Sequence, residues 1–416
     1  MSSALPPSSG AAPRAAAMPS AAAAAPLRLY PLLLAALLGT MAMMAYVAVI
    51  GPAVRRLGLP EWVAGLSVTA GGIFWMLLAR AWGRASDRAG RKPVLLVGLG
   101  VFALTYLGMA LGVDLALRGA LGGVAVVALL IVTRALVGAF YAAVPPTAAA
   151  VIADHTPPAS RGVVMAKLGS ANALGMVAGP AAAGWLASRD LGLALYAAAA
   201  LPAIAFVLIA LRLPARAPVA APAGGPGGKG GIGLWDARLR LPVLTAFIAM
   251  ASVAVAQVSV GFFAIDRFGL REEEGARVAG LALTAVGCAL ILSQQLVMRL
   301  RGVPPLRWVW VGALISGLGF LSVFWIHSQA ALLAAYGCAA FGMGFIFPTF
   351  QAMAANAVQA HEQGAAAGNL SAAQGLGMVL GPLIGTLVYR LAPGAPYALV
   401  GAALLTLSLS VALRPR

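Results

Sequence analysis

Arg134 is the charged residue of this sequence whose position points most directly to chemistry. It stands near the middle of an apolar run over residues 121–152, and we place no other charged residue so deep in such a run. A guanidinium inside a membrane costs about 3 kcal/mol or more unless it faces a cavity or a partner. Arg134 therefore predicts either a role in substrate binding or proton coupling, or a structural arginine that backbone carbonyls satisfy.

Carboxylates that could bind and release protons inside a membrane are missing from the apolar runs. The acidic residues fall between these runs or near their ends: Glu61, Asp87, Asp114, Asp154, Asp190, Asp236, Asp266, Glu272, Glu273, Glu274 and Glu362. Asp266 and Glu61 come nearest to an apolar run, so they are our candidates for proton coupling.

A short segment rich in glycine, arginine and aspartate joins two apolar runs. It reads Gly83-Arg-Ala-Ser-Asp87-Arg88-Ala-Gly90-Arg91-Lys92-Pro93. Gly83 and Gly90 permit a tight turn and a close approach of helices, and Asp87 suits the positive N-terminal end of another helix. We expect Asp154 to pair with Arg91, because both stand at the ends of apolar runs. A simple excess of cations on one side of a membrane explains the arginines and the lysine, but not Asp87 or the glycine spacing.

A segment of small residues occurs twice. Leu174-Gly175-Met-Val-Ala-Gly179-Pro180 recurs as Leu376-Gly377-Met-Val-Leu-Gly381-Pro382, and Gly184 and Gly385 continue the two copies. The offset of 202 residues (174 to 376) also carries Pro146-Thr147 onto Pro348-Thr349 and Gly162 onto Gly364. Small residues four apart let two helices approach closely, and proline permits a bend. Generic helix packing explains the glycines as well, but the shared offset predicts two related halves.

Polar and aromatic side chains inside the apolar runs predict a binding cavity. The candidates are Tyr46, Tyr141, Gln257, Gln294, Gln295, Phe347 and Gln351. Buried amides need hydrogen-bond partners, so bonding between helices is as good an interpretation as contact with a ligand. Taken together, these side chains suit an amphipathic organic molecule.

Several classes of site are excluded by composition. The net charge of +17 sits in short clusters between apolar runs, so we expect no nucleic-acid partner. The three histidines, His155, His327 and His361, lie far apart, and both cysteines, Cys288 and Cys338, fall inside apolar runs. We therefore expect no metal site, no cofactor and no disulfide framework, and we expect no enzyme because no nucleophile with a base or phosphate loop is present.

The elements that must position these residues are membrane helices. Of the 416 residues, 62% are hydrophobic and only 9% are charged, which is far more apolar than a soluble domain. Apolar stretches of about 20 residues, enough to cross a bilayer, recur along the chain. We predict spans at residues 29–53, 62–81, 93–113, 121–152, 163–187, 192–213, 241–264, 277–298, 307–327, 330–357, 364–389 and 394–413.

The spans form two groups of six. We expect a disordered tail at residues 1–27, a first bundle at 28–213, a linker at 214–240 and a second bundle at 241–416. With both termini in the cytoplasm, 19 of the 28 lysines and arginines lie on the cytoplasmic side, 8 lie outside and Arg134 lies within a span. That excess predicts a multi-pass protein of an inner membrane with cytoplasmic termini and linker.

The motifs resemble those of the major facilitator superfamily. The segment 83–93 is similar to its GxxxDRxGRR loop, called motif A, and Arg134 with Gly138 is similar to motif B, although Val137 replaces its glutamine. The segment 175–184 resembles motif C, GxxxGPxxGG, with Ala183 in place of one glycine. The resemblance implies an all-α membrane protein with twelve transmembrane helices in two pseudo-symmetric six-helix bundles.

The resemblance also implies a function. The sequence looks closest to the twelve-helix drug:proton antiporter branch, in which motif A acts as a conformational gate and motif C is typical of antiporters. We expect a monomeric secondary transporter that exports an amphipathic small molecule in exchange for protons. Export of an endogenous metabolite such as a siderophore, or of a sugar, is the alternative, and a non-transporting receptor or scaffold on the same fold is a further one.

Overall fold

The computed structural model describes residues 29–156, 158–214, 236–300, 303–359 and 362–413. The predicted tail at 1–27, residues 215–235 of the predicted linker and His361 lie outside these residues. Within the described residues the chain is helical and contains no strand. This is expected in lipid, where a helix satisfies its own backbone hydrogen bonds.

Thirteen α-helices and one short 3₁₀ turn make up the described chain. The first half contains α1 (Tyr30–Arg56), α2 (Trp62–Ala89), α3 (Arg91–Leu117), α4 (Gly123–Tyr141), α5 (Val144–His155), α6 (Pro158–Ala187) and α7 (Leu191–Arg212). The second half contains α8 (Arg240–Phe268), α9 (Glu272–Arg299), α10 (Pro305–Ser322) with the 3₁₀ turn Val323–Trp325, α11 (Gln329–Asn356), α12 (Gln363–Tyr389) and α13 (Ala395–Ala412).

The predicted span at 121–152 is interrupted, which corrects the sequence-based expectation of one continuous helix. α4 ends at Tyr141 and α5 begins at Val144. Pro145 and Pro146 explain the break, because neither has an N–H to donate to a carbonyl in the preceding turn. The two helices still cross the membrane together as one candidate span over 123–152.

The described chain contains eleven spans that are long and apolar enough to cross a membrane. α6 is not counted among them, but its 30 residues exceed the length of a membrane span and it packs along α1 and α9. With α6 included, the predicted fold of twelve spans in two bundles of six is confirmed.

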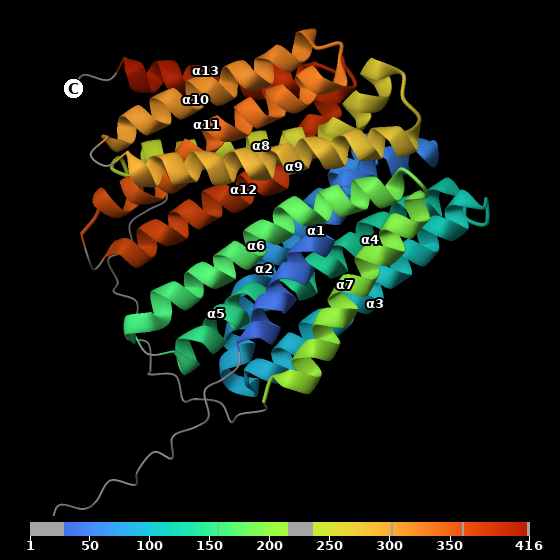
Figure 1. The fold of residues 1–416 in the computed structure, drawn as a ribbon, viewed down its shortest axis with the longest axis horizontal. Helices are drawn as coiled ribbons and strands as arrows, with labels where there is room; N and C mark the ends of the chain where they lie inside the picture. The colour runs from blue at the N-terminus through green and yellow to red at the C-terminus, as the bar shows by residue number, and fades with distance from the viewer. Residues whose placement is uncertain (1–28, 157, 215–235, 301–302, 360–361, 414–416) are drawn as a thin grey trace, which may run out of the picture.

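The two halves lie side by side (Figure 1). α1 to α7 form one bundle, and α8 to α13 form the other. α1 begins, α7 ends, α8 begins and α13 ends at the same end of the molecule, which we call the linker end; the opposite end is the distal end. Contacts between the halves join α6 with α9, α2 with α12, and α1 with both α8 and α9.

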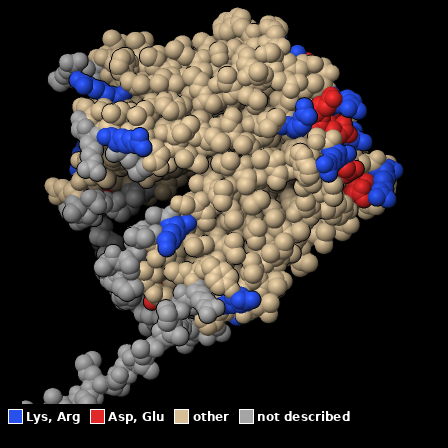
Figure 2. Space-filling model, viewed as in Figure 1, with Lys and Arg blue, Asp and Glu red and all other residues tan. Residues whose placement is uncertain are grey.

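Charged side chains are distributed unequally between the two ends. Figure 2 shows acids mixed with lysines and arginines at the distal end and mainly lysines and arginines at the linker end, while a broad uncharged surface covers the sides of the bundle. It also shows a hollow between the two halves at the linker end. In Figure 1, α6 and α12 diverge towards that end. The halves are therefore joined at the distal end and separated at the linker end.

Candidate transport cavity and gating contacts

A cavity with two adjoining chambers lies between the halves. The chambers have volumes of about 190 Å³ and about 270 Å³, and both are lined by Met44, Met176, Gln257, Leu283, Val286, Leu290 and Phe347. Met44 comes from α1 and Met176 from α6, whereas the other shared residues come from the second half. The cavity thus lies where both halves meet.

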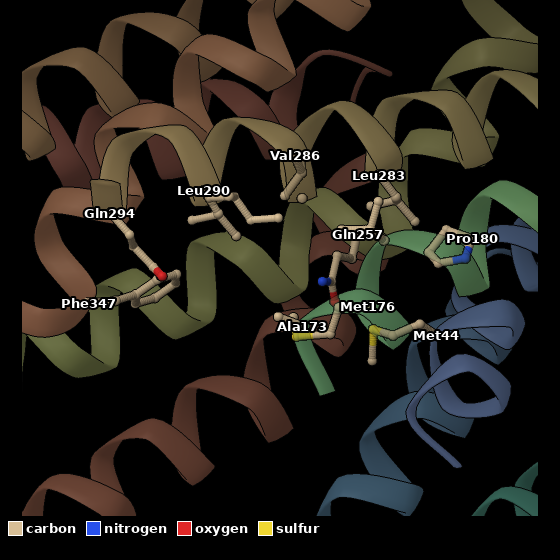
Figure 3. Close-up of a pocket in the computed structure, with 13 residues that line it drawn as sticks. Met44, Ala173, Met176, Pro180, Gln257, Leu283, Val286, Leu290, Gln294 and Phe347 are labelled. Carbon is tan, nitrogen blue, oxygen red and sulfur yellow. The ribbon is translucent and has the colours of Figure 1, made fainter. Parts of the chain in front are cut away.

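The second half supplies the polar groups of this cavity. Figure 3 shows the amide of Gln257 pointing towards Met176, and Gln294 pointing from α9 towards the ring of Phe347. Gln351 and Gln374 line the larger chamber and also a third hollow of about 250 Å³ between α11 and α12 near the linker end. A path lined by amides therefore leads from the central cavity towards the linker end.

Three of the glutamines are free to bind a ligand. Among the described residues, Gln257, Gln294 and Gln351 have no hydrogen-bond partner, whereas Gln374 donates to the carbonyl of Leu370 at 3.4 Å. Each amide group offers two donors and an acceptor oxygen. Polar groups of this kind, set in an apolar wall, are what orients a small molecule in a binding cavity.

Arg134 lies inside the first half and does not line the described chambers. Its side chain is only 3% exposed, and its guanidinium carbon stands 4.1 Å from the centre of the Tyr46 ring. Its Nη1 lies 3.8 Å from the sulfur of Met43, and its Nε has no hydrogen-bond partner. A desolvated cation over an aromatic face gains about 2 kcal/mol, and Tyr46 is in turn fixed by a 2.7 Å hydrogen bond with Ser67.

Two other predicted cavity residues lie elsewhere. Tyr141 is buried in the first half, where its hydroxyl bonds Thr40 at 3.0 Å, and Thr40 donates to Asn172 at 2.8 Å. Gln295 is exposed on α9 and does not line the described chambers. Sequence alone placed these residues in a span but could not tell which face of the helix they occupy.

Ion pairs close the distal end. Arg55 on α1 bonds Asp266 on α8 at 2.5 Å and Glu61 at 2.8 Å, and Arg56 pairs with Glu273 on α9. Tyr389 also donates to Asp266, at 2.7 Å. We call Arg55, Arg56, Glu61, Asp266 and Glu273 the distal ion-pair cluster. It brings together both predicted proton-coupling candidates, Asp266 and Glu61, around one arginine.

Ion pairs at the linker end stay within one half, as far as the described residues show. Arg238, just before α8, bonds Glu362 at the start of α12 through both terminal nitrogens at 3.0 Å. Arg238 also bonds Asp236, and this holds the pKa of the Asp236 carboxyl below its usual value. These contacts strengthen the second half without tying it to the first.

Two helix contacts below the distal ion-pair cluster follow one design. A Cβ built at Gly280 on α9 would lie 2.5 Å from the carbonyl oxygen of Pro180 on α6. A Cβ built at Gly65 on α2 would lie 2.5 Å from the carbonyl oxygen of Pro382 on α12. Only glycine permits such approaches. In each case the carbonyl of a proline in one half packs against a glycine of the other half. We call the first contact the α6–α9 seam and the second the α2–α12 seam.

The repeated glycines pack each proline helix inside its own half. Gly175 and Gly179 lie against the carbonyls of Leu37 and Met41 on α1, at 2.7 and 2.5 Å from a built Cβ. Gly377 and Gly381 lie in the same way against the carbonyls of Phe247 and Ala251 on α8. Gly184 faces α9 across the seam, and Gly385 packs on Val255 of α8. The small-residue pattern therefore serves close packing on one face and the seam on the other.

Comparisons with known proteins agree with this architecture. The family model described as Major Facilitator Superfamily matches residues 32–382 and 275–416. This chain belongs to that superfamily. It is 30% identical to the tetracycline resistance protein, class G, of Vibrio anguillarum over 393 residues, covering 87% of this chain and 91% of that protein. It is 24% identical to multidrug resistance protein 1 of Bacillus subtilis (strain 168), covering 86% and 88%.

Solved structures share the superfamily fold. A bacterial homologue of the human lysosomal transporter Spinster aligns with a TM-score of 0.68 at 14% identity, over 92% of this chain and 94% of that one. The nucleoside transporter NupG aligns with a TM-score of 0.71 at 13% identity, over 92% and 98%. Likenesses this distant establish the fold alone.

The superfamily motif between α2 and α3 forms a compact ion-pair network. Arg91 donates to Asp154 at 2.9 Å and to Asp87 at 2.5 Å, so the expected pair of Arg91 and Asp154 is present. Gly90 has a φ of +92°, which favours glycine and makes the turn between the helices. Gly83, in contrast, faces open space, so the close helix approach expected there is absent.

The other cations of this loop behave differently. Lys92 donates to the carbonyl of Ala210 on α7 at 2.8 Å and so ties α3 to α7. Arg88 is exposed and has no ion pair with a described residue. All of these contacts lie within the first half, so in this conformation the motif does not bridge the two halves through any described residue.

Sequence reasoning missed Gly65 and Gly280, which form the other side of the two seams. A signal for them exists: Val63-Ala64-Gly65-Leu66 recurs as Val278-Ala279-Gly280-Leu281. The offset of 215 residues (65 to 280) differs from the 202 of the proline helices, because loop lengths differ between the halves of this superfamily member. The offset of 202 therefore does not align these two segments.

Proposed function

We propose that this chain exports amphipathic, drug-like small molecules across a membrane by alternating access. The observation that carries the proposal is the cavity between the halves, which is closed at the distal end by the distal ion-pair cluster and hollowed towards the linker end. The names of the tetracycline and multidrug resistance relatives support export of such compounds.

The mechanism needs the two halves to swing about their shared contacts. In the conformation described above, a molecule reaches the chambers from the linker end along Gln374 and Gln351. Separation of Arg55 from Asp266 and of Arg56 from Glu273 opens the distal end, while the linker ends come together. Such rocking around a central site is the general behaviour of transporters built from two repeats.

The orientation follows from charge. The excess of lysine and arginine on the linker side supports a linker and two termini in the cytoplasm of a bacterial-type inner membrane. The described conformation then opens to the cytoplasm, which is the state that loads an exporter. Similarity to motif C supports exchange for protons, and Asp266 and Glu61 remain the carboxylate candidates for that exchange.

Arg134 fits a role in coupling better than a role in substrate contact. It is buried beside Tyr46, away from the described chambers, and no described carboxylate pairs with it. None of the described lining residues of the two chambers is a cation, so these residues offer no counter-charge to an anionic substrate. The same apolar cavity accepts an amphipathic endogenous metabolite as readily as a drug, so the export function covers both.

Inverted membrane vesicles test the proposal. Vesicles that contain the protein are acidified by respiration, and tetracycline or chloramphenicol is added while an internal pH dye is read. We expect drug accumulation and a loss of internal protons, both about tenfold weaker in Arg134→Met vesicles, with the KM for drug unchanged because the residue acts on coupling. Drug export at full rate in Arg134→Met would remove the coupling role, and no accumulation of any compound would remove the function.

A further inference from the structure

The cavity contains no charge that a described residue contributes. Although the chain carries 28 lysines and arginines and 11 acids, no described lining residue of the two chambers or of the third hollow is ionised at neutral pH. An ion that enters such a space loses its hydration and gains no counter-charge, which strongly disfavours its transfer. A neutral molecule does not meet this penalty.

The polar groups that are present suit neutral hydrogen-bonding molecules. Gln257 and Gln294 project into the smaller chamber, and Gln351 into the larger one, without partners among the described residues. An amide donates and accepts without a formal charge. It therefore pairs with the hydroxyl, carbonyl or amide groups of a ligand and gives no preference to an ion.

Arg134 adds an obstacle for cations. Met43, which touches its guanidinium, and Met44, which lines the cavity, are neighbours in α1, so the buried charge and the cavity lie on different sides of this helix. No described carboxylate neutralises it. Because charges are weakly screened in a protein interior, its positive field disfavours a positively charged ligand in the adjacent cavity.

The apolar part of the wall tolerates many shapes. The larger chamber is lined by the methionines Met44, Met176, Met250, Met343 and Met378, together with aromatic rings. Methionine is flexible and polarisable, and surfaces rich in it accept varied ligands. Shape therefore contributes little selection, and charge contributes most of it.

We propose that this cavity selects uncharged, hydrogen-bonding amphipathic molecules and excludes permanent cations. The proposal rests on the export function above and specifies its substrate class.

Binding to the purified full-length protein in lipid nanodiscs tests this selection. The probes are chloramphenicol, which is neutral, its succinate ester, which is an anion, and ethidium, which is a permanent cation. We expect chloramphenicol to bind about tenfold or more tightly than either ion. Equal affinity for ethidium and chloramphenicol would overturn the proposal.

Two neighbouring glutamines provide a matched pair of variants. Gln294 lines the smaller chamber, whereas Gln295 is not among the described lining residues of either chamber. Gln294→Glu should raise the affinity for ethidium about tenfold and lower that for chloramphenicol, while Gln295→Glu should change neither. Gln257→Glu repeats the test from α8 if the first variant folds poorly. The same gain in both Gln294→Glu and Gln295→Glu would show that ethidium binds elsewhere, against the proposal.

Export of the same probes distinguishes a failure of the charge selection from a failure of the export function. If vesicles export ethidium as efficiently as chloramphenicol, the export function stands and the charge selection is wrong. If they export neither these probes nor tetracycline, the export function fails and the substrate class with it.

Discussion

The α6–α9 seam and the α2–α12 seam are built alike but differ in one hydrogen bond. On α2, Thr69 donates across the seam to the carbonyl of Val379 on α12 at 2.6 Å. Its counterpart by the offset of 215, Thr284 on α9, donates instead to Gly280 within its own helix at 2.7 Å. One seam therefore has a polar link between the halves, whereas no hydrogen bond between described residues crosses the other.

The two seams also differ in their relation to the cavity. Pro180 and Val177 of α6, and Leu283 and Gly287 of α9, line the smaller chamber. No residue of α2 is among the described lining residues of either chamber. The α6–α9 seam thus borders the smaller chamber through both of its helices, whereas the α2–α12 seam borders the larger chamber only through Gln374 and Met378 of α12. We infer that the first opens and closes with the substrate and the second acts as the steadier contact.

Filling the glycines of the two seams should give the largest effect. Gly280→Val places a side chain against the Pro180 carbonyl and the Cα of Gly184, and Gly65→Val does so against Pro382. Overpacking of this kind costs about 1–3 kcal/mol, and in a two-state equilibrium that is a shift of about 5- to 150-fold. We expect both variants to favour the state with an open distal end.

Spin labels at Ala120 and His327, which are exposed at the distal end on different halves, report that opening as a longer distance. Gly108→Val is the control, because nothing lies within 4 Å of a Cβ at Gly108. If the seams differ as inferred, chloramphenicol changes the distance distribution of Gly280→Val more than that of Gly65→Val. Identical responses in the two variants would mean that both seams move alike.

Removing the cross-seam hydrogen bond should give an intermediate effect. Thr69→Val keeps the shape of the side chain and deletes the donor to Val379. A net loss of about 0.5–1.5 kcal/mol is expected for a buried bond of this type. The distance between the same two labels should therefore shift towards the open state, by less than in Gly65→Val.

Thr284→Val is the matched control for this substitution. It deletes a bond that lies within α9, so the balance between the two conformations should stay as in the unmodified protein. Equal shifts in the two threonine variants would contradict the idea that the α2–α12 seam alone has a polar link.

The fold could be predicted from the sequence because long apolar segments identify membrane helices. A run of about 20 apolar residues has few alternatives in lipid, and the repeat of Gly175–Pro180 at Gly377–Pro382 specified two related halves. The break between α4 and α5 was missed although Pro145 and Pro146 signal it. The continuous hydropathy of residues 121–152 predicted one helix, although the two prolines favour a break.

The candidate site was accessible only in part. Gln257, Gln294, Phe347 and Gln351 were placed in the cavity, because polar or aromatic groups within a span turn away from lipid. Tyr46 also points away from lipid, but it contacts Arg134 inside the first bundle and does not line the described chambers between the two bundles. Which interior a side chain enters depends on helix rotation, and rotation is set by packing contacts such as Gly65 with Pro382, far apart in sequence.

Weakening the distal ion-pair cluster should give the smallest effect. Arg55→Met removes the bonds to Asp266 and Glu61 but keeps an apolar side chain of similar length. The side chains of Arg55 and Asp266 are 31% and 28% exposed, so water and salt screen the pair. Partly exposed ion pairs are worth roughly 0.2–1 kcal/mol, and the open state should gain about 1.5- to 5-fold.

Salt and a second substitution separate this effect from those of the seams. In the unmodified protein, raising the ionic strength should move the label distance towards its value in Arg55→Met. The label distances in the Gly65→Val and Gly280→Val variants should show no stronger salt dependence than the unmodified protein. Arg118→Met, which removes a pair with Asp114 inside the first half, should leave the distance unchanged.

If Arg55 acts through Asp266, adding Asp266→Asn to Arg55→Met should shift the distance no further. A fully additive double variant would mean that the two residues hold the distal end closed by separate contacts and not through the bond between them.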